Sequence, residues 1–483
     1  MRMLRHVSFA VICCLFAIFT ACETDDFSTN PADKLVFSAD TVAFDTVFTA
    51  LGSRTEVLKV FNPNKKALKI SHISLEKGSN SFFKINVDGA TNKNYQFADI
   101  EILPKDSIYI FITLKIDPNN ANTPILVDDD IRFELNNNRQ DVHLEAFGQD
   151  VEILRNRFIF SDSTLSAHKP YLIYDTLFIA ENKTLSIDAG AKLYFHKNAV
   201  LIALGNLRAE GTIEKPIEMR GDRLDNLNFS DYPLPYNYVA GQWSGIFLLG
   251  NNGNHLLKNV RINSADVGIY LYNEDKTTLP KLQLENCRLH NFLFYGLVVQ
   301  NADVKVLNSE ISNAASHCVY LNGGNHTFVH CTVANYFGTG QNSSRSQEAA
   351  VMIYNLGHEA QMATKFLNCV IMGSLGNEFA LLTDFPQQYN GTFADSYIRR
   401  TDTLAYTPQF QQIKWHKQGD VVFRNTPTDF KDNNYFDFQL DSVSPARNIA
   451  NPSVTNAYGL QLDFLGNDRT TDGQPDAGAY EMN

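Results

Sequence analysis

The feature that most constrains the fold of this chain is a 22-residue repeat in its second half. The repeat relates three sets of positions: Cys287, Ser309 and Cys331; Leu289, Ile311 and Val333; and Asn291, Asn313 and Asn335. A fixed period with short apolar runs between turns indicates a solenoid, whose coils stack at strand spacing and place equivalent side chains in ladders. Apolar ladders would form the core, and Asn would occupy tight turns that require a left-handed backbone.

The repeat also predicts which side chains align between coils. Segments 258–262 and 367–371 fit the same pattern with changed loop lengths. The outward column on the repeated strand is predicted to be Arg261, Arg288, Glu310, Thr332 and Val370. The four cysteines after residue 22 are predicted to be buried core thiols, because Cys287 and Cys331 lie two coils apart, beyond disulfide reach.

Very short strands with Gly or Asn between them precede the repeat, at 184–190, 192–195, 200–203 and 205–212. They resemble the opening coils of pectate-lyase-like proteins, so residues 151–400 are predicted to form a right-handed parallel β-helix. Residues 401–483 lose the repeat, and 463–469 with 475–481 resemble the segments that cover the last coil of β-helix surface proteins. Asp463, Arg469 and Asp476 there are interpreted as capping salt bridges, with a catalytic cluster as the alternative.

Residues 34–150 alternate apolar and polar positions in short runs separated by turn residues, which favours an antiparallel β-sandwich. The predicted strands are 35–37, 57–61, 68–70, 82–87, 107–114, 130–135 and 142–146. Their order resembles Hydin-like immunoglobulin modules. The fold class is therefore all-β: an immunoglobulin-like sandwich, then a right-handed parallel β-helix with a C-terminal cap. The sandwich is expected to act as a spacer, or to dock a partner.

The N-terminal residues have the features of a secretory signal peptide. Arg2 and Arg5 precede an apolar run from Val7 to Ala21, which is too short for a permanent span. Residues 19–22 resemble the bacterial lipobox, which implies a signal peptide over 1–21 and acylation, for example with palmitate, at Cys22. The acidic residues in the tether at 22–33 resemble the signal by which Bacteroidota send lipoproteins to the cell surface. The expected location is the outer membrane, lipid-anchored and facing the exterior.

Charge and cysteine usage limit the partners. The formal net charge is −12 and no basic run occurs outside the N-terminus, so no nucleic-acid partner is expected. The cysteines and histidines lack zinc-ligand spacing, so no metal or cofactor is expected.

Overall the chain resembles a Bacteroidota family of surface lipoproteins with an immunoglobulin-like module ahead of a β-helix. The favoured function is a non-catalytic binding or scaffold subunit, docked on an outer-membrane β-barrel or binding glycan. The candidate ligand surface comprises Trp243, Tyr232, Tyr236, Tyr238, Arg261 and Arg288.

The alternative is a calcium-dependent polysaccharide lyase or a glycoside hydrolase acting on acidic polysaccharide. Such an enzyme needs clustered carboxylates beside a base, and the predicted outward column supplies only Glu310. A carboxylate groove with a basic neighbour would favour the enzyme, whereas a flat apolar or aromatic patch would favour a binding role with a protein partner.

Overall fold

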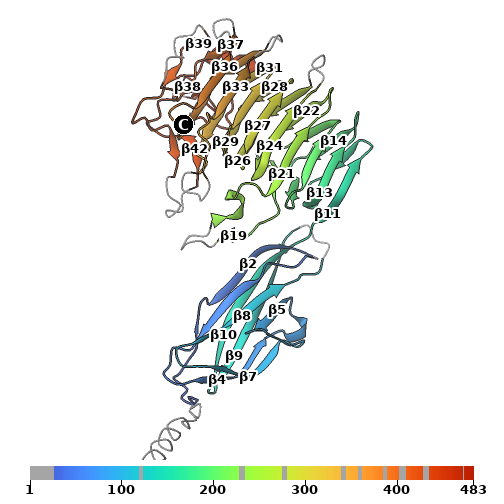
Figure 1. Cartoon of the computed structure of the whole chain (residues 1–483), viewed down its shortest axis with the longest axis vertical. Coiled ribbons are helices and arrows are strands. Elements are labelled where there is room, and N and C mark those ends of the chain that lie inside the picture. The colour runs from blue at the N-terminus through green and yellow to red at the C-terminus, as the bar shows by residue number, and fades with distance from the viewer. Residues whose placement is uncertain are drawn as a thin grey trace, which may run out of the picture. The chain divides into compact units, whose positions relative to one another are not determined.

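The computed structural model describes residues 27–49, 51–118, 123–227, 234–274, 280–338, 344–356, 362–384, 389–401, 409–427, 435–471 and 473–482. The predicted signal peptide, Cys22 and Tyr232 lie outside these residues. The chain divides into two compact units, Met1–Asp150 and Val151–Asn483 (Figure 1). Among the described residues, no helix has the length and apolar character needed to cross a bilayer.

The first unit is a sandwich of two five-stranded sheets. The first sheet has the order β1 (Val36–Phe37), β3 (Glu56–Phe61), β8 (Ser107–Leu114), β5 (Phe83–Val87) and β6 (Ala90–Thr91). The second has the order β2 (Thr41–Phe48), β10 (Asn138–Gln149), β9 (Ile125–Leu135), β4 (Leu68–Leu75) and β7 (Gln96–Ile102).

Alternation builds this sandwich, because every second side chain of each strand points into the shared core. In β8, Ile108, Ile110, Ile112 and Leu114 are buried while Tyr109 and Phe111 are exposed. The seven predicted strands are all present. Strands β2 and β7 were not predicted, since acidic residues such as Asp45 and Asp99 interrupt their apolar pattern.

The second unit is a right-handed parallel β-helix. Strands β11 (Glu152–Ile159) and β13 (Tyr171–Ile179) begin it, and each later coil contributes up to three strands to three stacked faces (Figure 1). Face A contains β15 (Lys192–Phe195), β18 (Ile217–Gly221), β23 (Val260–Asn263), β26 (Arg288–Phe292), β29 (Glu310–Ala314), β32 (Thr332–Asn335), β35 (Val370–Gly373), β38 (Tyr397–Ile398) and β40 (Lys414–Trp415).

The other two faces follow the same parallel order. Face B contains β16 (Val200–Ala203), β21 (Trp243–Leu248), β24 (Ala265–Tyr272), β27 (Tyr295–Gln300), β30 (Val319–Asn322), β33 (Val351–Asn355) and β36 (Phe379–Thr383). Face C contains β12 (Ser163–Leu165), β14 (Thr184–Asp188), β17 (Asn206–Glu210), β22 (Asn254–Lys258), β25 (Lys281–Glu285), β28 (Asp303–Leu307), β31 (Asn325–Val329), β34 (Ala363–Leu367), β37 (Asn390–Ala394) and β39 (Phe410–Gln411).

The predicted register of face A is confirmed. Arg261 pairs with Arg288, Arg288 with Glu310, Glu310 with Thr332, and Thr332 with Val370. The inward side chains stack as well: the rings of Phe328 and Phe366 are 4.3 Å apart and nearly parallel. All four cysteines, including Cys287 and Cys331, are free and buried, and burial raises the pKa of Cys287 to about 12.

The left-handed turns differ partly from the prediction. Asn291 and Asn313 have the predicted positive φ, whereas Asn335 lies in β32 without one, and the side chains of Asn291 and Asn313 bond backbone groups. The asparagine ladder lies instead at the turn between faces C and A. There Asn286 Nδ2 donates to Asn259 Oδ1 over 2.5 Å, and Asn308 Nδ2 donates to Asn286 Oδ1 over 2.9 Å. Each turn has a single left-handed residue, a conformation that asparagine tolerates well.

The described parts of the C-terminal segment, which we define as residues 420–482, lie along the side of the β-helix. It contains β41 (Phe423–Asn425), β42 (Asp437–Leu440) and α2 (Pro452–Tyr458), and its apolar residues pack on Ala334, Val370, Met372 and Tyr397 of face A. The sequence predicted that such residues cover the last coil. In the structure, this segment instead runs along several coils, because the asparagine ladder and face A provide polar partners for it. Asn308 Nδ2 donates to Leu462 O, and Asn368 Nδ2 donates to Asn451 O.

Candidate ligand-binding face

Trp243 does not belong to a ligand surface, which corrects the sequence prediction. Its side chain is fully buried in the β-helix core, where it stacks on Phe195 with ring centroids 4.0 Å apart. The indole N–H donates to Asn263 O over 2.9 Å, so its polar group is also engaged inside the protein. In the sequence Trp243 follows the Tyr- and Pro-rich stretch 225–238, which favours a projecting loop, but in the structure Trp243 already begins β21.

Tyr236 and Tyr238 are the two tyrosines of the candidate ligand surface that the structure describes, and each contacts another side chain of the protein. Both lie in the short 3-10 turn Tyr236–Tyr238, after the strand pair β19 (Asn226–Leu227) and β20 (Leu234–Pro235). The guanidinium of Arg223 lies 4.0 Å from the centre of the Tyr236 ring. Tyr238 lies 5.3 Å from the ring of Tyr435, and burial raises its pKa to about 12. These rings do not form one surface with Trp243.

The two arginines are half-buried against the C-terminal segment rather than freely exposed, a second correction. The Arg261 guanidinium lies 4.0 Å from the centre of the Phe464 ring in the C-terminal segment. Arg288 Nε lies 3.3 Å from Glu310 Oε1. Sequence reasoning identified both as outward residues of face A, but it could not show that residues 420–482 cover that face.

Glu310 is the centre of a buried polar cluster. It accepts hydrogen bonds from Ser312 Oγ over 2.5 Å and from the Tyr480 hydroxyl. Burial alone would raise the pKa of Glu310, but Arg288 and these hydroxyls hold it below its usual value. Burial and Arg288 lower the pKa of neighbouring His290 to about 3, so this imidazole stays neutral at physiological pH. The cluster attaches the C-terminal segment to face A, because Tyr480 of this segment donates its hydroxyl hydrogen bond to Glu310.

A row of partly exposed aromatic rings lies on the outer surface of face B of the β-helix. One outward column aligns Phe178, Ile202, Phe247, Tyr270, Val298, Tyr320 and Met352 through successive pairings. We define the aromatic face as the half-buried or exposed rings of this column and of those beside it: Phe158, Phe178, Phe247, Tyr270, Tyr272, Tyr295, Tyr320 and Tyr354.

Strand alternation positions these rings. In β24, Ile269 and Leu271 are buried in the core, so Tyr270 and Tyr272 must point outward. Neighbouring rings lie close together: Phe247 and Tyr270, which pair in register, are 5.6 Å apart, and Tyr320 and Tyr354, in adjacent columns, are 6.5 Å apart. Because each ring is fixed on a sheet, the face is preorganised before a ligand binds.

Polar but uncharged groups lie between the rings. Tyr272 pairs in register with Gln300, and Gln300 with Asn322. Beside them, the His317 ring lies 5.8 Å from Tyr320, and burial lowers the pKa of His317. Stacked rings with interspersed amide and hydroxyl groups can bind a ligand that has both apolar faces and many hydroxyl groups.

Sequence reasoning missed this face, although its signal was present. Residues 268–271 and 318–321 are short apolar runs, and the alternation of a strand places Tyr270 and Tyr320 outside. Among the described residues, no three His, Cys, Asp or Glu side chains gather as they would around a metal ion.

Comparison with known proteins supports the fold and little more. The family described as "Right handed beta helix region" matches residues 244–372. A search of curated proteins finds no match.

Three solved structures resemble part of the chain. They are a protein of unknown function from Porphyromonas gingivalis W83 (11% identity, 26% of this chain, 60% of that chain, TM-score 0.18), the ASH/PapD-like domain 7 of human CEP192 (13%, 26%, 92%, 0.17) and a family 123 glycoside hydrolase from Clostridium perfringens (9%, 28%, 31%, 0.19). The chain thus spans less than two thirds of the first and third of these proteins. At these TM-scores the likeness says nothing of function.

Proposed function

We propose that this chain is a lipid-anchored surface protein that binds polysaccharide along its aromatic face without cleaving it. The observation that carries the proposal is the outward column from Phe178 to Tyr320, in which four of six positions are aromatic and Ile202 and Val298 are the other two. The C–H-rich faces of sugar rings stack on aromatic side chains, while sugar hydroxyls bond the amides and phenols between them. The absence of charged side chains from the ring column described above favours neutral sugar units.

The polar groups distinguish this ligand from a protein partner. An apolar or aromatic patch favours a protein partner, but here the amides of Gln300 and Asn322 continue the column that begins at Tyr272 and can bond sugar hydroxyl groups. An outer-membrane β-barrel partner remains the competing outcome. An acidic-polysaccharide lyase is less favoured, because Arg288 and Glu310 are engaged beneath the C-terminal segment.

Replacement of two rings should weaken polysaccharide binding. We expect Tyr270→Ala with Tyr320→Ala to raise the Kd for a neutral polysaccharide by about tenfold, since a ring contact contributes about 0.5–1.5 kcal/mol. The measurement is calorimetry with the full chain and the tightest ligand from a panel of dextran, laminarin, xylan and mannan. Tyr270→Phe with Tyr320→Phe should retain most of the affinity, because the rings remain.

The control is Tyr174→Ala, which removes a partly exposed tyrosine that lies 3.8 Å from Arg155, outside the aromatic face. Equal weakening by this control would contradict the proposal. Recovery of a stoichiometric β-barrel protein from native membranes, lost in the double alanine variant and without polysaccharide binding, would replace glycan by a protein partner.

We further propose that Cys22 carries the lipid and that the first unit, an immunoglobulin-like module, separates the β-helix from an outer membrane of Bacteroidota type. Cys22→Ser should remove the acyl chains, whose buried carbons provide the membrane affinity. We expect the variant to lose labelling by a palmitate analogue and to leave the membrane fraction. Unchanged fractionation of an unlabelled variant would show that another element holds the protein.

A further inference from the structure

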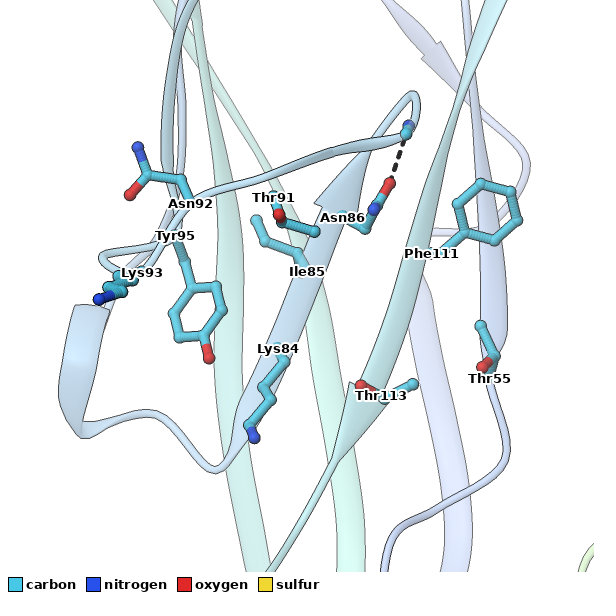
Figure 2. A pocket seen from close by; sticks show the side chains of 11 residues that line it. Thr55, Lys84, Ile85, Asn86, Thr91, Asn92, Lys93, Tyr95, Phe111 and Thr113 are labelled. Carbon is cyan, nitrogen blue, oxygen red and sulfur yellow. Dashed lines mark hydrogen bonds between the residues drawn. The ribbon is translucent and has the colours of Figure 1, made fainter.

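The first unit contains a second candidate binding site that the aromatic face does not explain. An open depression of about 860 Å³ lies on the outer surface of the first sheet, beside the loop that follows β6 (Figure 2). We call it the lysine depression and define it by Lys84, Asn92, Lys93, Tyr95, Phe111 and Thr113. Its size is within the range of small-molecule sites.

Strand pairing places the groups of its floor. Lys84 of β5 pairs directly with Thr113 of β8, and Asn86 pairs with Phe111. These side chains point outward because Phe83, Ile85 and Val87 alternate with them into the core. Figure 2 shows the Lys84 chain between Tyr95 and Thr113. A cation, an exposed ring and a hydroxyl therefore share one surface.

The wall is a loop with a constrained backbone. Tyr95 has a φ of 51°, a left-handed conformation that is uncommon for a bulky residue. The loop is closed by Tyr95 N–H donating to Asn92 O over 3.1 Å and by Asn94 N–H donating to Asn92 Oδ1 over 2.8 Å. The loop places Tyr95 between Lys93 and Lys84 (Figure 2), and an uncommon backbone conformation of this kind is often found at ligand sites.

Charge sets the depression apart from the rest of the chain. Its lining has two lysines and no carboxylate, in a protein whose formal net charge is −12. On the same sheet surface, Lys59 lies 5.9 Å from the centre of the exposed Tyr109 ring. Local positive charge within an acidic protein selects an anionic ligand.

We propose that the lysine depression binds the anionic sugar unit of an acidic polysaccharide. The ammonium groups of Lys84 and Lys93 bind the carboxylate or sulfate oxygens by charge-assisted hydrogen bonds. Phe111 contacts the face of the sugar ring, and Tyr95, Thr113 and Asn92 bond its hydroxyl groups. The neutral hydrogen-bonding groups outnumber the two cations, which suits a sugar better than an acidic peptide.

The test is calorimetric titration of the full chain in detergent with dextran sulfate, polygalacturonate, unmodified dextran and polyglutamate. We expect at least one acidic polysaccharide to bind, more weakly at higher salt, and polyglutamate not to bind. Lys84→Gln with Lys93→Gln should raise the Kd for the acidic polysaccharide by about tenfold or more and leave binding of neutral polysaccharide unchanged. Tyr95→Phe, which preserves charge and ring, should raise it severalfold.

The matched control is Lys65→Gln with Lys66→Gln, which removes the same charge from two exposed lysines of the same unit outside the depression. Three results would overturn the proposal: equal weakening by this control, equal binding of polyglutamate, or binding of neither acidic polysaccharide. A sulfate-only or uronate-only response supports it and identifies the anion.

Discussion

Replacement of Arg469 by methionine is expected to lower the free energy of unfolding of the β-helix by about 3–5 kcal/mol. The Arg469 side chain is fully buried and donates to Asn308 Oδ1 over 2.8 Å, to Gly478 O over 3.0 Å and to Glu481 Oε2 over 3.3 Å. Arg469 therefore links Asn308 of the asparagine ladder to Gly478 and Glu481 near the end of the C-terminal segment. Its loss leaves the Glu481 carboxylate buried without its cation, which costs more than the lost hydrogen bonds.

The measurement is denaturant unfolding followed by tryptophan fluorescence. The two tryptophans, Trp243 and Trp415, are both in the second unit, so the signal reports the β-helix and not the sandwich. Glu481→Gln in the Arg469→Met background should recover part of the loss, because it removes one uncompensated charge. Asp463 and Asp476, which also lie near the guanidinium, limit that recovery.

Arg208→Met is the control for this prediction. Arg208 forms an exposed pair with Glu210 at 3.4 Å on face C. An exposed pair contributes little, so this change should alter the free energy of unfolding by less than about 1 kcal/mol. If Arg469→Met cost no more than Arg208→Met, the C-terminal segment would not be fastened as described.

The repeat predicted the pairing of strands between coils well, because the spacing of equivalent residues in the sequence determines which residues stack. Residues 22 positions apart, such as Arg288 and Glu310, do pair in register, and Cys287 and Cys331 are buried as expected. In a parallel coil each residue lies beside the equivalent residue of the next coil, so the repeat length in the sequence predicts which residues are in contact. The same reasoning could not identify the asparagine ladder uniquely, because Asn286 and Asn291 both recur with the period.

Contacts distant in sequence were beyond the sequence argument. In the sequence, Arg261 and Arg288 look like exposed ligand-binding residues. In the structure, Phe464 lies against Arg261, and Tyr480 bonds Glu310, the partner of Arg288, although both are about 200 residues later in the sequence. Trp243 looked like a loop aromatic, although a core position was equally compatible with its glycine-rich neighbours. Tyr270 and Tyr320 were accessible to prediction, since alternation alone places them outside. Burial by an irregular segment has no period and therefore leaves no local signal.

The β-helix should lose stability steeply as the pH falls below about 6.5. Besides His317, whose pKa is also lowered, four buried histidines have pKa values far below the usual one: His255 and His326 at about 4, His290 at about 3, and His330 well below its usual value. Burial is the main cause, because it disfavours the charged imidazolium. Each histidine binds a proton in the unfolded state at a pH where the folded state does not, so acidification favours unfolding.

The size of the effect follows from this linkage. Between pH 6.5 and 5.5 each histidine should lower the free energy of unfolding by about 1 kcal/mol, and the four together by about 4 kcal/mol. The window lies above the titration of ordinary carboxyl groups, so histidines dominate it. Unfolding midpoints from tryptophan fluorescence at several pH values measure the slope for the second unit.

His330→Asn tests one histidine without disturbing the turn. His330 has a φ of 50° in the column where Asn308 and Asn368 have φ values of 50° and 55°, so asparagine suits its backbone. The variant should reduce the pH slope by about a quarter, since one of four protons is removed. It also loses the contacts of His330 Nε2 with Thr455 Oγ1 at 2.8 Å and Asn368 Nδ2 at 3.0 Å, which changes stability at all pH values but not the slope. His168→Gln, at an exposed position of the same unit, should leave the slope unchanged. An unchanged slope in His330→Asn would contradict this account, because it would mean that His330 binds no additional proton when the β-helix unfolds.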